Sequence, residues 1–279
     1  MENKWNDADA KAAIEKYSDV ADDIALRVYT SRLIGADPSL VLHGGGNTSV
    51  KSRTRNKVNE EVDVLYVKGS GWDLDTLEPP GLPGVLLDHL QKLRSLDRLS
   101  DEEMVNEQRT HLLDASSPNP SVETLLHAFL PHKFIDHSHA DASLVIANQP
   151  DAEKICQEIY GDRIGIVSYI MPGFALAKAS AEVYEKNPHV EGLLLINHGL
   201  FTFGNTAKES YDRHIHAVTL AEEYIGKKPL KALTPLEGPA LKAGEETLMN
   251  VLAPVLRGLY REQSGKDWVL HHRADTKEF

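Results

Sequence analysis

Three histidines have the spacing and setting of metal ligands. His137 and His139 lie two residues apart in an apolar stretch, residues 133–147, that predicts a long strand. Because side chains alternate between the two faces of a strand, both imidazoles would point to the same side. His198 follows a second apolar stretch and precedes a glycine. Three histidines on rigid strands would leave one position of a zinc ion open to a substrate, as catalytic zinc requires.

The pair at 137 and 139 alone is equally compatible with ordinary surface or core histidines, and the third histidine favours a site. A carboxylate, Glu123, lies 14 residues before His137, at the predicted start of a helix over residues 121–130. In isolation, such a residue more often stabilises the amino end of its helix. Beside a metal, it could move a proton as a general acid or base. Five of the other histidines are expected to be solvated: His189, His214, His216, His271 and His272.

A glycine-rich stretch, Leu-His-Gly-Gly-Gly-Asn-Thr-Ser-Val-Lys at residues 42–51, could bind an anion. It lacks the Gly-Lys-Ser/Thr and following helix of a Walker A loop. It also lacks the third glycine of the dinucleotide fingerprint, where Ser49 stands, and its exit is predicted to be a strand. What remains is a glycine turn with bare amides next to small polar side chains, which suits a phosphate or another oxyanion.

The composition narrows the classes of partner. The 279-residue chain has a formal net charge of −12, and its 30 Lys and Arg gather on no basic face, which argues against nucleic acid or an anionic membrane as main partner. Its apolar runs are too short for a membrane span or a signal peptide. The single cysteine, Cys156, cannot form an internal disulfide and is expected in the core, so the sequence favours a reducing cytoplasm.

The periodicity of apolar residues predicts a sheet with helices on its faces. The expected helices cover residues 7–34, 83–96, 101–113, 121–130, 151–160, 174–185 and 206–225. The expected strands cover residues 40–53 and 62–68, which would pair as a hairpin, and 133–147, 164–169, 191–196 and 200–203.

Taken together, the motifs resemble those of the class II aldolase/adducin family. They occur in the order seen there, and the resemblance covers roughly residues 20–228. Within that family the chain is most similar to the aldolase half of bifunctional rhamnulose-1-phosphate aldolase/lactaldehyde dehydrogenase proteins. The motifs are Gly46-Asn47-Thr48-Ser49, Gly69-Ser70-Gly71, Pro120-Ser121-x-Glu123-x-x-x-His127, His137-x-His139 and Asn197-His198-Gly199-Leu200.

The resemblance implies an α/β fold of three layers, α/β/α, with a central and mostly antiparallel sheet, in ring-like homotetramers with sites at subunit boundaries. It also implies that His137, His139 and His198 bind zinc or another divalent metal, and that Glu123 is the acid/base. The residues implied to hold the substrate phosphate, through amides and hydroxyls, are Gly46, Asn47, Ser70, Gly71 and Ser121. The family often has Ser-Ser-Glu here, so Val122 removes one phosphate hydroxyl.

The implied reaction is reversible aldol cleavage of a ketose 1-phosphate, such as rhamnulose 1-phosphate, to dihydroxyacetone phosphate and a small aldehyde. In this reversible reaction, a tyrosine would be the proton donor to the aldehyde oxygen in the direction of synthesis. Tyr160 is the candidate, because Tyr169 is expected to pack at a strand end. Sugar-phosphate epimerases and metal-dependent decarboxylases of the family share the metal ligands. Two alternatives are an adducin-like binding module without catalysis and a Schiff-base aldolase using Lys68.

Two segments are expected: a catalytic domain at residues 1–229 and a helical extension at 230–279. Within the extension, residues 241–261 have an apolar helical face that Pro254 should bend or interrupt, and residues 268–271 resemble a strand. The extension should pack against its own assembly or begin a linker to a downstream domain. It is expected to support assembly rather than to supply catalytic groups.

Overall fold

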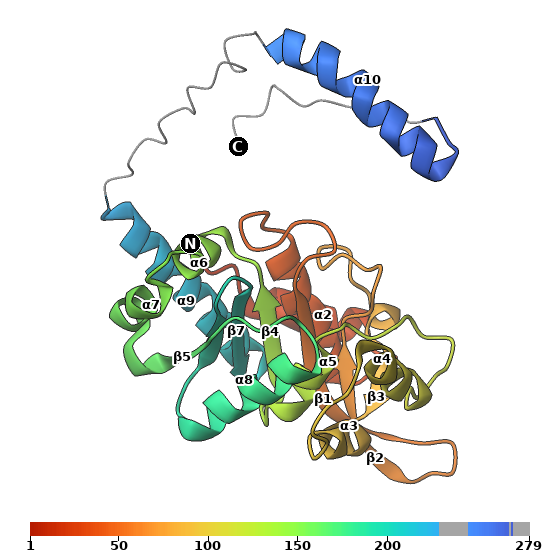
Figure 1. Cartoon of the computed structure of the whole chain (residues 1–279). Coiled ribbons are helices and arrows are strands. Elements are labelled where there is room, and N and C mark those ends of the chain that lie inside the picture. The colour runs from red at the N-terminus through yellow and green to blue at the C-terminus, as the bar shows by residue number, and fades with distance from the viewer. Residues whose placement is uncertain (229–244, 268, 270–279) are drawn as a thin grey trace. The chain divides into compact units, whose positions relative to one another are not determined.

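The computed structural model describes residues 1–228, 245–267 and 269. The chain divides into two units, Met1–Lys228 and Pro229–Phe279, which are described separately. All elements in Figure 1 except helix α10 belong to the first unit.

A seven-stranded sheet forms the centre of the first unit. Its strands lie in the order β3-β2-β1-β4-β7-β6-β5, so the central strand, β4, lies between β1 and β7. Only β5 and β6 pair in parallel; every other neighbouring pair is antiparallel. The strands are β1 (Asn47–Arg55), β2 (Glu61–Val67), β3 (Gly84–Leu86), β4 (Phe134–Ser138), β5 (Ile164–Val167), β6 (Gly192–Leu195) and β7 (Gly199–Gly204).

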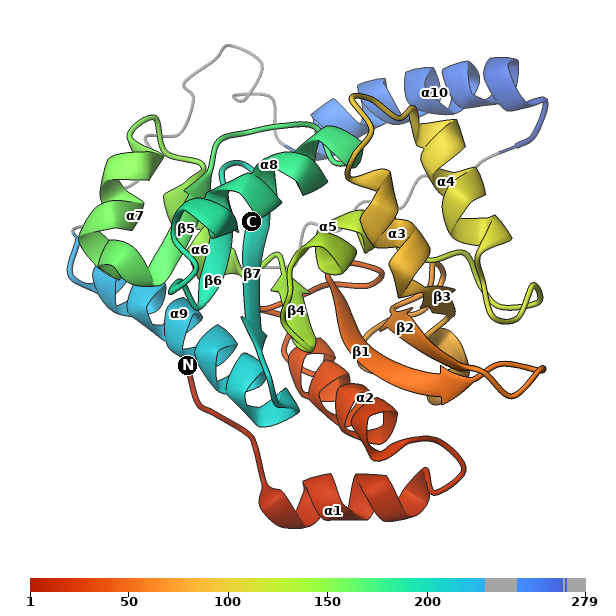
Figure 2. The same cartoon turned by 90° about the horizontal axis from the view of Figure 1, so that it is seen from below.

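Helices cover both faces of the sheet, as Figure 2 shows. One buried apolar cluster joins one face to α1 (Asp7–Lys16), α2 (Asp22–Gly35), α6 (Asp141–Ala147), α7 (Ala152–Tyr160) and α9 (Ala207–Gly226). A second cluster joins the other face to α3 (Leu87–Leu93), α4 (Asp101–Thr110), α5 (Thr124–Phe129) and α8 (Phe174–Lys186). The predicted three-layer fold with a mostly antiparallel sheet is confirmed.

Strand β4 separates two polar systems because its side chains alternate between the faces. All five of its residues are buried. Asp136 is directed to the α2 and α9 side, where it bonds Arg27 and Ser210. His137 is directed to the opposite side, where it approaches Glu123. A predicted metal ligand and a structural carboxylate therefore occupy adjacent positions without sharing a face.

The buried ion pair between Arg27 and Asp136 fastens α2 to the centre of the sheet. Both side chains are fully buried. The guanidinium also donates to Thr30 Oγ1 at 2.5 Å and to the carbonyl oxygens of Ser49 and Ile135, both at 3.3 Å. The pair therefore links one helix to two neighbouring strands.

Removing one member of this pair should destabilise the protein strongly. Arg27→Met is expected to lower the free energy of unfolding by about 3–5 kcal/mol, because it leaves the Asp136 carboxylate buried and uncompensated. Arg53→Met breaks the exposed pair with Asp63 and should cost about 1 kcal/mol or less. Urea unfolding of the two variants measures the difference, and equal losses would contradict this account.

Several predicted elements differ from the observed ones. The strand expected at 133–147 ends at Ser138, and helix α6 follows from Asp141. A short apolar run fits either element. Here Ile146 and Ala147 are buried while Val145 is exposed, which is a helical rather than an alternating pattern.

Other differences arise at turns and edges. The helix expected at 7–34 is two helices, α1 and α2. Strand β1 begins at Asn47 rather than near residue 40, after a turn in which Gly46 has φ +64°. The helix expected at 83–96 begins with the edge strand β3, which pairs with β2, so only Leu87–Leu93 is helical.

His214, expected in solvent, is buried and bonds Thr202 and Ser138. Cys156 lies in the core, where burial raises the pKa of its thiol to about 12.

The second unit contains α10 (Glu245–Ser264), which continues through Pro254 rather than ending there. Of the strand expected at 268–271, residues 268, 270 and 271 lie outside the described residues. Within the described part of the chain, no helix is both long and apolar enough to cross a membrane.

Candidate active site

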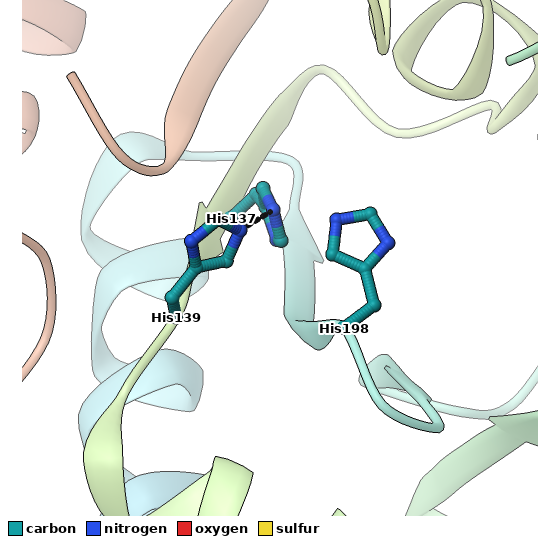
Figure 3. A group of neighbouring side chains, drawn as sticks. All are labelled: His137, His139 and His198. Atoms are coloured by element: carbon teal, nitrogen blue, oxygen red, sulfur yellow. Dashed lines mark hydrogen bonds between the residues drawn. The ribbon is translucent and has the colours of Figure 1, made fainter. Parts of the chain in front are cut away.

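The three predicted metal ligands come together at the end of the central strands, as Figure 3 shows. His137 lies in β4, His139 follows the end of that strand, and His198 lies in the turn between β6 and β7. One ring nitrogen of each lies within 4.8 Å of the others. Nε2 of His137 and Nε2 of His139 are 3.1 Å apart.

This geometry fits a metal ion. Ligand nitrogens on a tetrahedral zinc are separated by about 3.3 Å, given bonds of about 2.0–2.1 Å. Nδ1 of His137 donates to the carbonyl oxygen of Leu200 at 3.1 Å, which leaves Nε2 with a lone pair for a metal. Burial lowers the pKa of both His137 and His139, and the neutral imidazole is the form that binds metals.

The turn that carries His198 depends on two residues. Asn197 has φ +56°, a left-handed conformation that asparagine tolerates better than most residues. At Gly199, a Cβ would lie 2.6 Å from the Ser138 carbonyl oxygen and 2.9 Å from Cε1 of His137. Only glycine allows β7 to approach the ligand rings this closely.

Glu123 lies beside the histidines, immediately before α5. Its Oε1 is 3.0 Å from Nε2 of His198, and its Oε2 is 3.3 Å from Nε2 of His137. Oε2 also accepts from Nδ2 of Asn47 at 2.6 Å. Burial alone would raise the pKa of Glu123, but His137, His198 and the Asn47 amide outweigh it and hold the pKa below its usual range. Glu123 is therefore an ionised acceptor.

A cavity of about 490 Å³ opens over this cluster. It contains every residue that the resemblance assigned to the phosphate. Its lining residues are Gly44, Gly45, Gly46, Asn47, Lys68, Gly69, Ser70, Gly71, Ser121, Val122, Glu123, His139, Pro172 and His198. A larger cavity of about 630 Å³, near Tyr17 and Tyr66, contains none of the predicted site residues.

The donors for an anion differ in part from those expected. The backbone N–H of Ser70 already donates to Asn119, and that of Ser121 to Lys68. Their hydroxyls are therefore the groups left for a ligand. Gly71 has φ +86°, and a Cβ added there would meet no atom within 4 Å, so its backbone borders open space.

Lys68 is the lining residue whose setting the sequence did not show. It is 6% exposed and donates to the carbonyl oxygen of Gly44 at 3.1 Å. No carboxylate within the described residues lies within 4.0 Å of its ammonium. Burial lowers the pKa of Lys68, and Asp73 partly offsets that effect. A buried cation without a close counter-ion, at the wall of a cavity, is suited to an anionic ligand.

The structure does not bring Tyr160 to this cavity, which corrects its assignment as the proton donor of this pocket. Tyr160 ends α7 and is 3% exposed in the apolar cluster around α9, where burial raises the pKa of its phenol. Tyr169 does not pack as expected, since it is 52% exposed. Neither tyrosine lines the cavity.

A second group with metal-binding side chains lies elsewhere, formed by His89, Glu107 and His111. Its two imidazoles stack at 3.2 Å with planes 6° apart, and Glu107 Oε2 bonds Nε2 of His89 at 2.7 Å. Lone pairs in the planes of parallel rings do not converge on one point. This group is a hydrogen-bonded cluster in its present form, and it provides a matched control for the first.

Comparison with known proteins agrees with the fold and identifies the family. Residues 26–225 match the family model of the class II aldolase and adducin N-terminal domain, and the chain belongs to this family. It is 40% identical over 262 residues to "Uncharacterized oxidoreductase YuxG" of Bacillus subtilis, a match that covers 90% of this chain and 37% of that protein. The chain thus spans little more than a third of the length of this relative.

Similar solved structures include two with informative descriptions. The N-terminal class II aldolase domain of a conserved protein from Thermoplasma acidophilum has 43% identity and a TM-score of 0.72, covering 81% of this chain and 99% of that one. An L-fuculose 1-phosphate aldolase has 15% identity and a TM-score of 0.51, covering 85% and 97%. The second likeness shows the fold alone.

Proposed function

We propose that this site cleaves a ketose 1-phosphate reversibly to dihydroxyacetone phosphate and a small aldehyde, with a rhamnulose 1-phosphate-like sugar as substrate. The observation that supports this most is the arrangement of three convergent histidines, a buried carboxylate and a set of anion donors around one cavity. The family and its aldolase structures support a lyase acting on a sugar phosphate.

In the proposed mechanism, His137, His139 and His198 hold zinc or another divalent ion. Such an ion supplies Lewis-acid stabilisation of the negative charge that develops on substrate oxygens during carbon–carbon cleavage. In the direction of synthesis, the ionised Glu123 carboxylate removes a proton from the carbon that attacks the aldehyde. In cleavage, it takes up the proton that the substrate hydroxyl loses as the aldehyde forms, and returns it to that carbon. Oε1 is the oxygen assigned to this step, because Oε2 accepts a hydrogen bond from Asn47, whereas Oε1 lies 3.0 Å from Nε2 of His198.

The phosphate would lie against the glycine loop and the Ser70-Gly71 turn. The Ser121 hydroxyl and the Lys68 ammonium border the same cavity. Val122, which stands where the family often has serine, is 48% exposed at the cavity wall. We propose that Lys68 supplies charge where Val122 removes a hydroxyl.

A panel of ketose phosphates tests the reaction. Aldehyde release supports the aldolase, interconversion of pentulose phosphates would indicate an epimerase, and carbon dioxide a decarboxylase. An adducin-like binding module would have no need for the convergent histidines and Glu123. Absence of bound metal together with binding of a protein partner would favour that alternative.

Lys68→Met should weaken substrate binding more than turnover. We expect KM for the phosphorylated ketose to rise about 10–100-fold, because a charge-assisted contact contributes roughly 1.5–3 kcal/mol. KM for the same sugar without phosphate should not change. Lys57→Met, at an exposed lysine of the β1–β2 turn, serves as the control.

The same lysine discriminates between two mechanisms. A Schiff-base aldolase would instead lose kcat in Lys68→Met and would trap substrate carbon on Lys68 after borohydride reduction. Either result would contradict the phosphate-binding role. The proposal expects no adduct and full inhibition by a chelator.

A further inference from the structure

One face of β1 is polar where the strand passes α5. Asn47, Ser49 and Lys51 occupy alternate positions and therefore point to the same side. Oδ1 of Asn47 lies 2.5 Å from Nε2 of His127, and Oγ of Ser49 lies 2.8 Å from Nδ1 of the same ring. Nζ of Lys51 donates to the His127 carbonyl oxygen at 2.9 Å. All three side chains thus hold one residue of α5.

Lys51 fixes the helix that carries this residue. Its ammonium also donates to the carbonyl oxygens of Leu130 and His132, at 2.5 and 2.7 Å. These carbonyls lie at and beyond the carboxyl end of α5, where backbone acceptors have no partners within the helix. The His127 ring is fully buried and meets the edge of Phe201, with ring centroids 5.5 Å apart. The imidazole therefore has little freedom to turn.

The direction of these hydrogen bonds follows from the chemistry of the groups. A carboxylate only accepts, so Asn47 must present its NH₂ to Glu123. Oδ1 of Asn47 then faces Nε2 of His127, which must carry the proton. Burial lowers the pKa of His127 to about 3, so the ring is neutral and Nδ1 is an acceptor. The Ser49 hydroxyl must donate to it.

We infer that His127 is a positioning residue: the two hydrogen bonds that link Ser49 to His127 and His127 to Asn47 fix the Asn47 amide with its NH₂ toward Glu123. Without these bonds, the amide group can rotate by half a turn and exchange the positions of its donor and its acceptor. Turned over, Oδ1 of Asn47 would face the Glu123 carboxylate and repel it. With these hydrogen bonds in place, one N–H of the Asn47 amide donates to Oε2 of Glu123, and the other is available to a ligand in the cavity.

This inference rests on the proposed function only for its effect on turnover, so the first measurement does not use activity. In protein labelled with ¹⁵N-histidine, His127 should show a protonated Nε2 and a hydrogen-bonded, unprotonated Nδ1. Ser49→Ala should remove the hydrogen-bond signature at Nδ1. A ring protonated at Nδ1 would overturn the inference, whether or not the protein proves to be an aldolase.

Two variants of similar size then test the direction of these hydrogen bonds, with kcat as the measurement. His127→Gln places an amide N–H near the position of Nε2 and can still donate to Asn47. His127→Asn reaches only the position of Nδ1 and cannot. We expect kcat to fall about tenfold or less in the first and on the order of 100-fold in the second, the range found when supporting groups around a site are removed.

Bound metal should change little in both variants, because the hydrogen bonds of the His127 ring go to Asn47 and Ser49 rather than to the three histidines. Equal loss in the two, or greater loss in His127→Gln, would mean that His127 acts by packing alone. If neither variant folds, the ring protonation in wild-type and Ser49→Ala protein still decides. Inactive wild-type protein with the expected ring protonation would refute the proposed reaction and leave the positioning chain standing.

Discussion

Protein carrying both His137→Ala and His139→Ala should contain almost no bound metal. Purified wild-type protein is expected to hold about one divalent ion per chain, and the variant about a tenth of that or less, because two of three ligands are gone. Aldol cleavage should fall to background with it. Metal analysis of the purified proteins gives the stoichiometry directly.

The control uses the other histidine cluster. His89→Ala with His111→Ala removes the same number of imidazoles, but from stacked rings whose lone pairs do not converge. That variant should retain both metal and activity. Loss of metal from the His89→Ala/His111→Ala protein, or full occupancy in the His137→Ala/His139→Ala protein, would contradict the assignment of the metal to His137, His139 and His198.

The grouping of the three candidate histidines could be predicted because its signals are local. A spacing of two in an apolar strand places His137 and His139 together, and a histidine before glycine identifies the turn at His198. The strand itself was predicted too long, but the two imidazoles still lie together. His139 lies beyond the end of β4, but its ring still lies 3.1 Å from that of His137.

The positions of the Tyr160 and Lys68 side chains relative to the cavity could not be predicted, because they depend on packing between distant segments. Tyr160 ends a helix whose apolar side faces α9, and nothing in its neighbours along the chain shows which side the phenol takes. Lys68 precedes a glycine turn, and only the fold shows that its ammonium lines the cavity without a close carboxylate. Local patterns identify candidate ligands, whereas tertiary packing decides which other side chains lie beside them.

His127 had a signal in the sequence that remained unused. Asn47, Ser49 and Lys51 alternate as polar residues on a strand whose other face carries Thr48 and Val50. Three neighbouring polar side chains on one face of a strand require hydrogen-bond partners when that face is buried. That pattern predicts a polar group on the element that covers the face, and α5 supplies it through the His127 ring and backbone.

Glu123→Gln should abolish proton transfer without releasing the metal. The amide keeps the size of the side chain but cannot accept the substrate proton, so we expect turnover to fall by about 10²–10⁴-fold. The metal content should stay near that of the wild type, because the three histidines supply the ligands. Exchange of solvent deuterium into dihydroxyacetone phosphate measures the step, and it needs no knowledge of the aldehyde.

The partial reaction separates two roles for Glu123. If the carboxylate moves the proton, exchange and overall cleavage should fall together in Glu123→Gln. If it only orients Asn47 or the histidines, exchange should persist while KM rises. Glu107→Gln, in the stacked histidine cluster, should leave both rates unchanged. Exchange at the wild-type rate in Glu123→Gln would remove Glu123 from the mechanism, and an acid/base group would then have to come from outside the described pocket.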